Sequence, residues 1–399
     1  MRNIFTFLTN NKNKSILAFD AFEVLEYNDM DSLEMVSQFI EKHEGDYRFG
    51  FLSYDLKNEV EDLTSKNPDR IQFPLVGFFI PRYVVEWDES GKQTFLKGEA
   101  NQKAQDFIEN FLSQKEVQPN NKIELIAGLS KKEYISKIDK LQDEIQLGNI
   151  YEVTYCQEFY AEKSKIEPLP TYFALNKATK ATFSCFVEWE GKYLLSASPE
   201  RFLKREGKRL TTQPIKGTAK RGTTPEEDIR LKAELLASEK ERAENVMIVD
   251  LVRNDLSKIA ENKSVQVDEL FGVYTFETVH QLISTVSATI DESVTVLDIL
   301  KALFPMGSMT GAPKISAMEL IEEHEIFKRG LYSGSVGYFK PNGDFDFNVI
   351  IRSVLYNEEM QSISCPVGGA ITIKSSPEME YEECLVKVKA LKEVLFSHE

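Results

Sequence analysis

The sequence predicts an α+β fold with antiparallel sheets at its core. Strand-like stretches rich in Val, Ile, Phe and Tyr come in runs, at 330–339, 344–356 and 362–373, and helical patterns lie between such runs. A parallel α/β protein would alternate strand and helix regularly along the chain. We find no internal repeat. The grouping of the strands therefore favours an α+β architecture over a regular βαβ repeat.

The first part of the chain, to about residue 122, reads as mixed strands and helices, with a strand-like stretch at 73–87. The polar segment 114–121, which contains Pro119, predicts a linker or long loop. Few residue patterns typical of catalytic or binding sites precede this segment, so the candidate functional residues lie after it.

Three helices with end signals come after the linker. Ser130 is a candidate N-cap with Glu133 three residues later, and the apolar face of this helix ends at Gly148. Strands dominate after it, to about position 210. A second helix is predicted at about 225–252 and a last one at about 377–396, each with a proline at its start.

Composition narrows the class of partner. Lys and Arg total 48 against 64 Asp and Glu, which gives a net charge of −16. This charge disfavours nucleic acid or an anionic membrane as a partner, and no apolar run approaches a membrane span. The four cysteines form no CxxC pair and are too sparse for a disulfide scaffold. We therefore expect a cytoplasmic protein with no nucleic-acid or membrane partner.

Two pairs of glutamates have a spacing that suits a metal. Glu241 and Glu244 lie three residues apart on one predicted helix, and Glu380 and Glu383 repeat this spacing on the last one. Residues at i and i+3 share a helix face, and Mg²⁺ prefers oxygen ligands. A solvated helix face is the alternative for either pair alone. The apolar run 246–252 indicates a buried helix, where a carboxylate needs a partner such as a metal.

Lys216 is the most informative single residue. Pro214 precedes it, and Gly217 and Thr218 come next, so the backbone is tight and a ligand can approach closely. A lysine amine can attack carbon when it is neutral. The alternative from this segment alone is a solvated lysine in an ordinary turn.

Other segments are suited to hold an anion. The loop 307–314, with the Ser308 hydroxyl, leads into a predicted helix whose first amides are free to bind a carboxylate, although N-capping explains the same residues. Arg352 lies in an apolar strand-like stretch and could bind a carboxylate through two parallel hydrogen bonds.

Four more positions are candidates with simpler alternatives. Gly368 and Gly369 end a strand-like segment where a ligand could approach the backbone. Lys387 lies four residues after a glutamate and is either an intrahelical ion pair or a second cation. His280 lies among apolar and hydroxyl residues, where a structural histidine is the default.

Together these segments make the chain resemble the chorismate-utilising enzymes, which include anthranilate, aminodeoxychorismate, isochorismate and salicylate synthases. The resemblance covers roughly 125–396. It is carried by SASPERF (196–202), PIKGT (214–218), AENVMIVDLVRNDL (243–256), TVHQLIS (278–284), GSMTGAPK (307–314), YSGSVGYF (332–339) and EYEECLVK (380–387).

The resemblance implies a fold and a domain organisation. The fold would be that of the anthranilate synthase large subunit, a large core of two stacked, mainly antiparallel sheets flanked by helices. The chain would be one chorismate-binding unit over 1–399, with a variable N-terminal part at 1–122 and a catalytic part at 123–399.

Residue-wise matching implies roles for the candidates. Glu244 and Glu383 would bind Mg²⁺ directly, with Glu241 and Glu380 supporting it through water. Glu200 would be the general acid that protonates the departing 4-hydroxyl. His280 would lie near the reacting ring. The substrate carboxylates would be held by Tyr332, Arg352, Gly368, Gly369 and Lys387, with Ser308 where relatives usually have threonine.

Two positions separate the branches of the family. Anthranilate synthases generally carry alanine at the position of Lys216, whereas aminodeoxychorismate synthases carry lysine, which the resemblance implies adds covalently at ring C2. Isochorismate and salicylate synthases have a water-activating lysine at position 152, and the amine-transferring branches usually have glutamine. Glu152 is a departure at this substrate-binding wall, so it is either protonated or faces a cation.

The chemistry requires a neutral amine at Lys216. A free lysine has a pKa near 10.4, so only about one in 10³ is neutral at pH 7. We expect burial and positive charge from Mg²⁺, Lys220 and Arg221 to lower this pKa.

The resemblance therefore favours the aminodeoxychorismate synthase branch, whose large subunit converts chorismate and ammonia to 4-amino-4-deoxychorismate. No glutaminase signature surrounds any cysteine, so ammonia would come from a separate glutamine amidotransferase subunit. Anthranilate synthase and a non-catalytic chorismate-binding subunit remain alternatives. Tryptophan regulation is not expected, because 181–183 lacks the proline-containing segment that lines a tryptophan site in relatives.

Overall fold

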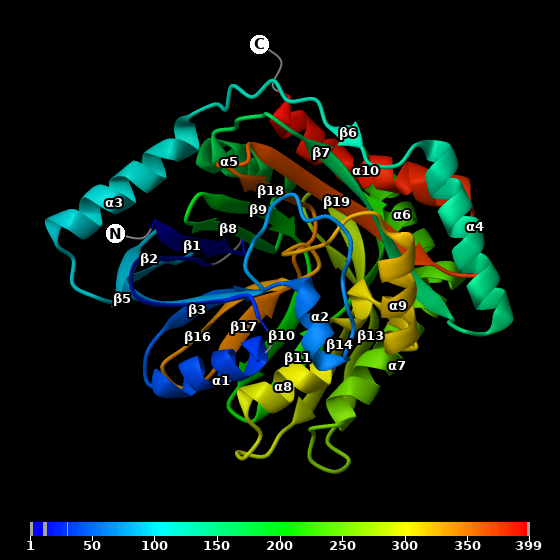
Figure 1. Cartoon of the computed structure of the whole chain (residues 1–399), viewed down its shortest axis with the longest axis horizontal. Helices are drawn as coiled ribbons and strands as arrows, with labels where there is room; N and C mark the ends of the chain where they lie inside the picture. Colours follow the sequence, from blue (N-terminus) through cyan, green and yellow to red (C-terminus); the bar gives the residue numbers. More distant parts are fainter. Residues whose placement is uncertain (1–2, 11–13, 30, 397–399) are drawn as a thin grey trace.

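The computed structural model describes residues 3–10, 14–29 and 31–396, and strands and helices from both ends of the chain interleave in it (Figure 1). The strands are β1 Ile4–Thr9, β2 Ser15–Tyr27, β3 Arg48–Leu52, β4 Val76–Trp87, β5 Gln93–Lys97, β6 Ile126–Ala127, β7 Glu152–Ala161, β8 Phe183–Trp189, β9 Lys192–Ser198, β10 Arg201–Glu206, β11 Arg209–Gln213, β12 Ile215–Lys220, β13 Gln266–Thr275, β14 Val279–Thr289, β15 Gly311–Ala312, β16 Ser335–Phe339, β17 Phe345–Asn348, β18 Ser353–Asn357 and β19 Ser362–Ile371. The helices are α1 Ser32–Lys42, α2 Lys57–Val60, α3 Gln102–Ser113, α4 Lys131–Leu147, α5 Pro168–Thr179, α6 Pro225–Ala237, α7 Glu239–Ser257, α8 Val296–Leu303, α9 Lys314–His324 and α10 Pro377–Leu395, with short 3₁₀ turns η1 Tyr54–Leu56, η2 Gln114–Glu116 and η3 Gly307–Met309.

All registered strand pairs are antiparallel, and they form one ladder with two arms. One arm runs β2-β1-β8-β9-β18-β19-β7, and the other runs β3-β16-β17-β10-β11-β14. The long strand β4 pairs with both β2 and β3, so it joins the two arms. The predicted α+β fold with mainly antiparallel sheets is therefore confirmed, and the two sheets prove to be continuous through β4.

The N-terminal strands belong to the same ladder as the C-terminal ones. β1 pairs with β8, and β3 pairs with β16, across more than a hundred residues of sequence. The segments before and after residue 122 therefore share backbone hydrogen bonds. The predicted boundary at 122 between a variable and a catalytic part stays a prediction.

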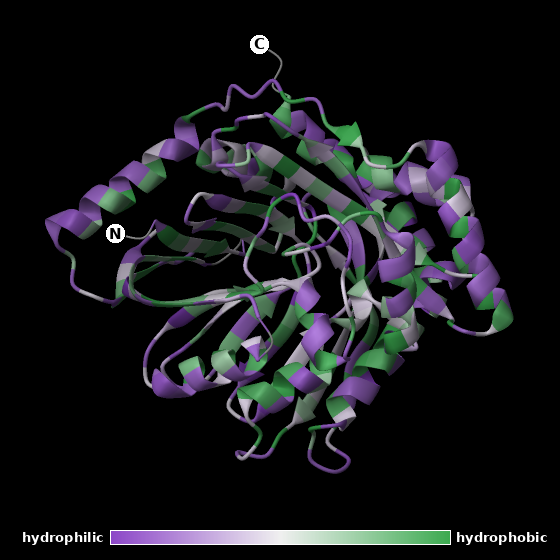
Figure 2. Cartoon of the chain, in the orientation of Figure 1, coloured by the Kyte–Doolittle hydropathy of each residue, from purple (hydrophilic) through white to green (hydrophobic). Residues whose placement is uncertain are grey.

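Apolar side chains form two core clusters. One contains Phe49, Phe78 and Trp189 between the arms, and the other contains Tyr134 and Phe186 beneath the helices that cover the first arm. Figure 2 shows this pattern as hydrophobic colouring on the central strands and hydrophilic colouring on much of α3 and α4. Helix α10, red in Figure 1, packs on β19 and on α5. This packing fixes the face of α10 that carries its two predicted ligands.

The helix predictions are confirmed in part. Helix α4 has the predicted capping box between Ser130 and Glu133 and ends at Gly148 in the left-handed region. The single helix predicted over 225–252 is wrong, because the chain is extended at Ser238. The Ser238 hydroxyl instead accepts a hydrogen bond from the Glu241 amide at 3.3 Å and caps α7.

Two strand predictions also need correction. The stretch 344–356 forms two strands, β17 and β18, because its middle residues turn and Arg352 has a φ of 50°. The stretch to position 210 contains helix α5, which prolines at 168 and 170 begin and which the strand prediction missed. No helix in the described part of the chain has the length and apolar character that crossing a membrane requires.

Candidate active site

Lys216 lies at a bulge in β12. Ile215 faces Ile283 and Thr218 faces Gln281, so two residues of β12 oppose a single residue of β14. Gly217 supplies the positive φ, 91°, that this local geometry needs. A bulge re-aims a side chain relative to the regular strand alternation, and here it turns Lys216 toward carboxylates of β7 and α7.

Gly217 also leaves room that an alanine would fill. A Cβ at this position would lie 2.9 Å from Glu241 Oε2, whereas a Cβ at Gly207, which also has a positive φ of 60°, would meet nothing within 4 Å. We expect Gly207→Ala to cost about 1 to 2 kcal/mol of unfolding free energy for the backbone alone. Gly217→Ala should cost about 1 kcal/mol more through overpacking. Urea unfolding of both variants measures this, and equal losses would contradict the predicted contact.

The Lys216 ammonium pairs with Glu152. Lys216 Nζ lies 2.8 Å from Glu152 Oε1, and the Glu152 side chain has no exposed surface. Glu152, which replaces the usual glutamine of the amine-transferring branches, therefore faces a cation. Burial lowers the pKa of Lys216, but the carboxylates of Glu152 and Glu244 outweigh it, and the net shift is upward. The protein's own side chains thus shift this pKa opposite to the expected direction, because carboxylates surround the amine and Arg221 bonds to Asp228 instead. The expected contribution of Mg²⁺ stays a prediction.

Glu200 lies in the turn between β9 and β10. Its amide donates to Ser198 Oγ at 3.2 Å, which holds the turn. Burial raises the pKa of Glu200 to about 7, although a hydrogen bond from Ser308 and the charge of Lys216 oppose this shift. About half of the Glu200 carboxyl groups are therefore protonated at pH 7, and a general acid must be protonated to act.

Arg352 stands next to this turn and not within a strand. The Val349 amide donates to the Glu200 carbonyl at 3.0 Å, and the Ala197 amide donates to the Arg352 carbonyl at 3.0 Å. Burial lowers the pKa of Arg352, while Glu200, Glu383 and Tyr332 act in the opposite direction. The guanidinium makes no side-chain hydrogen bond within the described residues, so its donors remain available for an anion.

The two predicted metal pairs converge from different helices. Glu241 and Glu244 come from α7, and Glu380 and Glu383 come from α10. The charges of Glu383 and Glu380 both act to raise the pKa of Glu241, so carboxylates of α10 lie near α7. Within the described residues no three acidic or metal-ligating side chains are already arranged around a common point.

Lys240 is a member of this cluster that the sequence prediction missed. Its Nζ lies 3.2 Å from Glu380 Oε1 and 3.8 Å from Glu244 Oε1. The spacing of four residues between Lys240 and Glu244 is the signal that could have revealed it. Glu244 Oε1 is buried and accepts no hydrogen bond from the described residues. Burial raises the pKa of Glu244 to about 7, and the charge of Glu241 adds to this.

Of the two predicted glycines, Gly369 borders the same acidic cluster and Gly368 packs against β7. A Cβ at Gly369 would lie 3.1 Å from Glu380 Oε2, and one at Gly368 would clash with Cys156 at 2.4 Å. Lys387 forms the intrahelical pair with Glu383 at 2.7 Å and also donates to the Gly368 carbonyl at 2.6 Å. Lys387 thereby ties α10 to β19 at the edge of the site.

A model of the family described as chorismate binding enzyme matches residues 4–393. The chain belongs to this chorismate-binding family. The crystal structure of anthranilate synthase component I from Streptococcus pneumoniae TIGR4 superposes with a TM-score of 0.82 at 28% identity, over 95% of this chain and 92% of that one. The predicted large-subunit fold is thus confirmed.

Relatives in the chorismate-binding family align with this chain over different shares of their own length. Aminodeoxychorismate synthase component 1 of Escherichia coli (strain K12) is 34% identical over 378 residues, which cover 90% of this chain and 82% of the relative. The chloroplastic aminodeoxychorismate synthase of Arabidopsis thaliana is 42% identical over 274 residues, 68% of this chain and 30% of the relative. The chain matches only about a third of the length of this and similar long relatives.

His280 forms hydrogen bonds to two residues outside the predicted site set. Its Nε2 lies 2.9 Å from Asp228 Oδ1, and its Nδ1 lies 3.0 Å from Thr275 Oγ1. Both ring nitrogens are engaged, so His280 connects β14 to α6 in this structure. Its implied position near the reacting ring stays a prediction.

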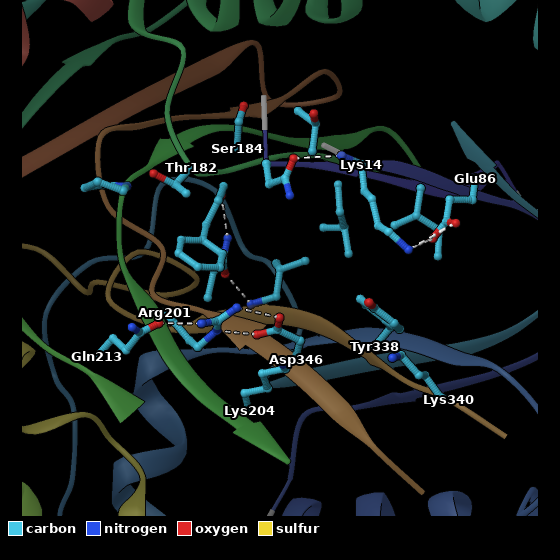
Figure 3. A pocket seen from close by; sticks show the side chains of 18 of the residues that line it. Lys14, Glu86, Thr182, Ser184, Arg201, Lys204, Gln213, Tyr338, Lys340 and Asp346 are labelled. Atoms are coloured by element: carbon cyan, nitrogen blue, oxygen red, sulfur yellow. Dashed lines mark hydrogen bonds and ion pairs between the residues drawn. The ribbon is translucent and has the colours of Figure 1, made fainter. Parts of the chain in front are cut away.

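A cavity of about 740 Å³ lies beside the family site and is lined by neither Lys216 nor Glu200. Pro199 and Ile215, their sequence neighbours, form part of its wall. Figure 3 shows Arg201 beside Asp346 on one wall of this cavity, and Arg201 Nε lies 2.9 Å from Asp346 Oδ1. Thr182 also lines the cavity, and it belongs to the segment 181–183 that lacks the proline-containing sequence of relatives. The segments that carry Glu200 and Lys216 therefore also border this cavity, although those two residues do not line it.

Proposed function

We propose that this protein is an aminodeoxychorismate synthase large subunit, which converts chorismate and ammonia to 4-amino-4-deoxychorismate. The observation that carries this proposal is Lys216, which the β12 bulge directs into a buried cluster beside Glu200. The kinship with aminodeoxychorismate synthases supports the same branch. An anthranilate synthase would need no lysine there, and it remains the second candidate because of the fold similarity.

The proposed reaction begins with the neutral amine of Lys216. Its lone pair forms a bond to ring C2 as the bond from C4 to its hydroxyl breaks, and Glu200 donates the proton that lets the hydroxyl leave as water. Ammonia then forms a bond to C4 as the bond from Lys216 to C2 breaks, and the new ammonium group returns one proton to Glu200. The guanidinium of Arg352 and the ammonium of Lys387 would bind the substrate carboxylates.

We further propose Mg²⁺ as the cofactor, held by Glu244 and Glu383 with Glu241 and Glu380 acting through water. The buried Glu244 oxygen that accepts no hydrogen bond from the described residues, and the carboxylates from two helices, fit a hard cation. When bound, the ion would neutralise the substrate carboxylate and the acidic cluster. Lys240 would then give up its contacts with this cluster.

Addition of Mg²⁺ should raise the melting temperature at pH 8. The raised pKa of Glu244, about 7, means that stability contributed by its protonated form is lost as pH rises from about 4.3 to 7. A cation at 100 times its Kd then contributes about 2.7 kcal/mol, which raises the melting temperature of a chain of this length by roughly 3 °C. The shift should be smaller at pH 5.5, where Glu244 is largely protonated.

Calorimetry of the wild type and Glu244→Gln, each with and without Mg²⁺, checks this prediction. The variant should melt at nearly the same temperature with and without the ion. An equal shift in both proteins would place the ion elsewhere.

The test of the function is purified protein with chorismate, Mg²⁺ and ammonium, followed by identification of the product. Formation of aminodeoxychorismate supports the proposal, anthranilate with pyruvate supports the second candidate, and binding without turnover supports a non-catalytic subunit. We also propose that a separate glutamine amidotransferase subunit supplies ammonia and that the protein is cytoplasmic. Four free, buried cysteines suit a reducing compartment.

A further inference from the structure

Glu152 is joined to Lys216 more directly than to any other part of the candidate site. Its Oε1 lies 2.8 Å from Lys216 Nζ, which is hydrogen-bonding distance. Its Oε2 is buried and has no hydrogen-bond partner within the described residues. Strand β7 holds the residue firmly, because Glu152 pairs with Ala312 of β15. A carboxylate fixed so close to the proposed nucleophile could exchange a proton with it, in addition to lining the substrate site.

We propose that Glu152 is the base that takes the ammonium proton of Lys216 and so releases the neutral amine for attack. The inference rests on the proposed function, because it assigns a partner to the nucleophile of that reaction. The proton moves from Lys216 Nζ to Glu152 Oε1, which leaves a neutral amine and a neutral acid. It returns to the lysine when the lysine leaves ring C2, so the cycle is balanced.

Other charged groups also face Lys216, and they are less suited to this step. They are Glu241 and Glu244 of α7, Glu200 of the turn between β9 and β10, and Glu383 of α10. Within the described residues only Glu152 lies within hydrogen-bonding distance of Nζ. Glu200 must keep its own proton to act as an acid, and α7 and α10 carry the predicted metal ligands.

The environment of the pair favours internal transfer. Glu152 has no exposed surface and the Lys216 side chain is 10% exposed, so bulk water has little access to the proton. Transfer converts a buried ion pair into two neutral groups and leaves no unpaired charge behind. Glutamine, the usual residue of the amine-transferring branches at this position, can form a hydrogen bond to the amine but cannot accept its proton.

The decisive experiment compares the wild type with Glu152→Gln, a variant of the same shape, over a range of pH. In the wild type the pair keeps its proton internally, so the fraction ready to react does not follow pH in the neutral range. In Glu152→Gln, Lys216 must lose its proton to solvent, and its neutral fraction rises about tenfold per pH unit below its pKa. Glu200 affects both proteins alike and cancels in the ratio of their rates.

The expected result is a kcat/KM ratio, wild type over variant, of about 10² to 10⁴ at pH 7 that falls about tenfold per pH unit up to pH 9. A ratio that does not change with pH would show that Glu152 only supports the structure, and it would overturn the proposal. A ratio near 1 throughout would overturn it as well.

A second measurement keeps the inference separate from the proposed function. Competitive acetylation of Lys216, quantified by mass spectrometry across pH, reports the pKa of the amine without any turnover. Loss of the paired carboxylate should lower the pH midpoint of labelling in Glu152→Gln, while the rate still falls because glutamine cannot accept the proton as the amine attacks. An unchanged midpoint overturns the pairing. A wild type that forms no aminodeoxychorismate contradicts the proposed function instead, so the two failures are distinguishable.

Discussion

Replacement of Lys216 by alanine should abolish formation of 4-amino-4-deoxychorismate. If the amine bonds to ring C2, its removal eliminates the main reaction path, and loss of an activated nucleophile lowers kcat by up to about 10⁶-fold. The variant should still bind chorismate, because the proposed carboxylate-binding residues Arg352 and Lys387 are unchanged. Product formation from chorismate and ammonium, together with a binding titration, measures both effects.

A covalent adduct provides a direct readout of the same step. Without ammonia, the wild type incubated with chorismate and Mg²⁺ should gain mass at Lys216, and Lys216→Ala should not. Lys208, which is exposed and pairs with Glu292, is a suitable control site for alanine substitution. Lys208→Ala should keep both the adduct and the rate. Full activity in Lys216→Ala would rule out the covalent role of Lys216. The residue could then at most help to position the substrate.

Replacement of Glu200 by glutamine should have the second largest effect. Glutamine cannot protonate the departing hydroxyl, and loss of a general acid lowers kcat about 10² to 10⁴-fold. Burial raises the pKa of Glu200 to about 7, so the reactive protonated form of the free enzyme is present below pH 7 and is lost above it. Wild-type kcat/KM should therefore decline above pH 7 by up to about tenfold per unit.

The pH profile separates a general acid from a merely structural carboxylate. Glu200→Gln should lose the decline above pH 7 along with most of its rate. Ser308→Ala should keep the decline but move it to higher pH, because the hydrogen bond from Ser308 opposes protonation of Glu200. A wild-type profile that stays flat to pH 9, or a variant that retains the decline, would assign the proton to another group.

The stability of the site depends on how its charges are balanced before substrate arrives. Carboxylates of several elements approach one lysine, Lys216, and a second lysine, Lys240, contacts two of the predicted metal ligands. Buried charges of one sign repel each other unless cations are placed among them. The protein supplies these cations from its own side chains, which explains why both lysines carry raised pKa values.

Several parts of this protein were predictable from the sequence alone. The capping box at Ser130 and the i, i+3 spacing of the glutamates on α7 and α10 are local patterns, and local patterns survive folding because neighbours along a helix stay neighbours. The seven family motifs likewise identify the chorismate-binding family from the sequence. The antiparallel architecture was predicted by the grouping of strands.

Other features required the tertiary structure. The break at Ser238 and the turn at Arg352 reflect competition between local propensity and packing, which a periodic pattern does not report. The Lys216 to Glu152 pair joins residues 64 positions apart, and only the bulge in β12 and the placement of β7 determine that their charged atoms meet. The sequence thus determined which residue types and motifs are present. The fold decided that Lys216 faces carboxylates and not cations, because long-range packing alone sets the surroundings of a buried amine and hence the direction of its pKa shift.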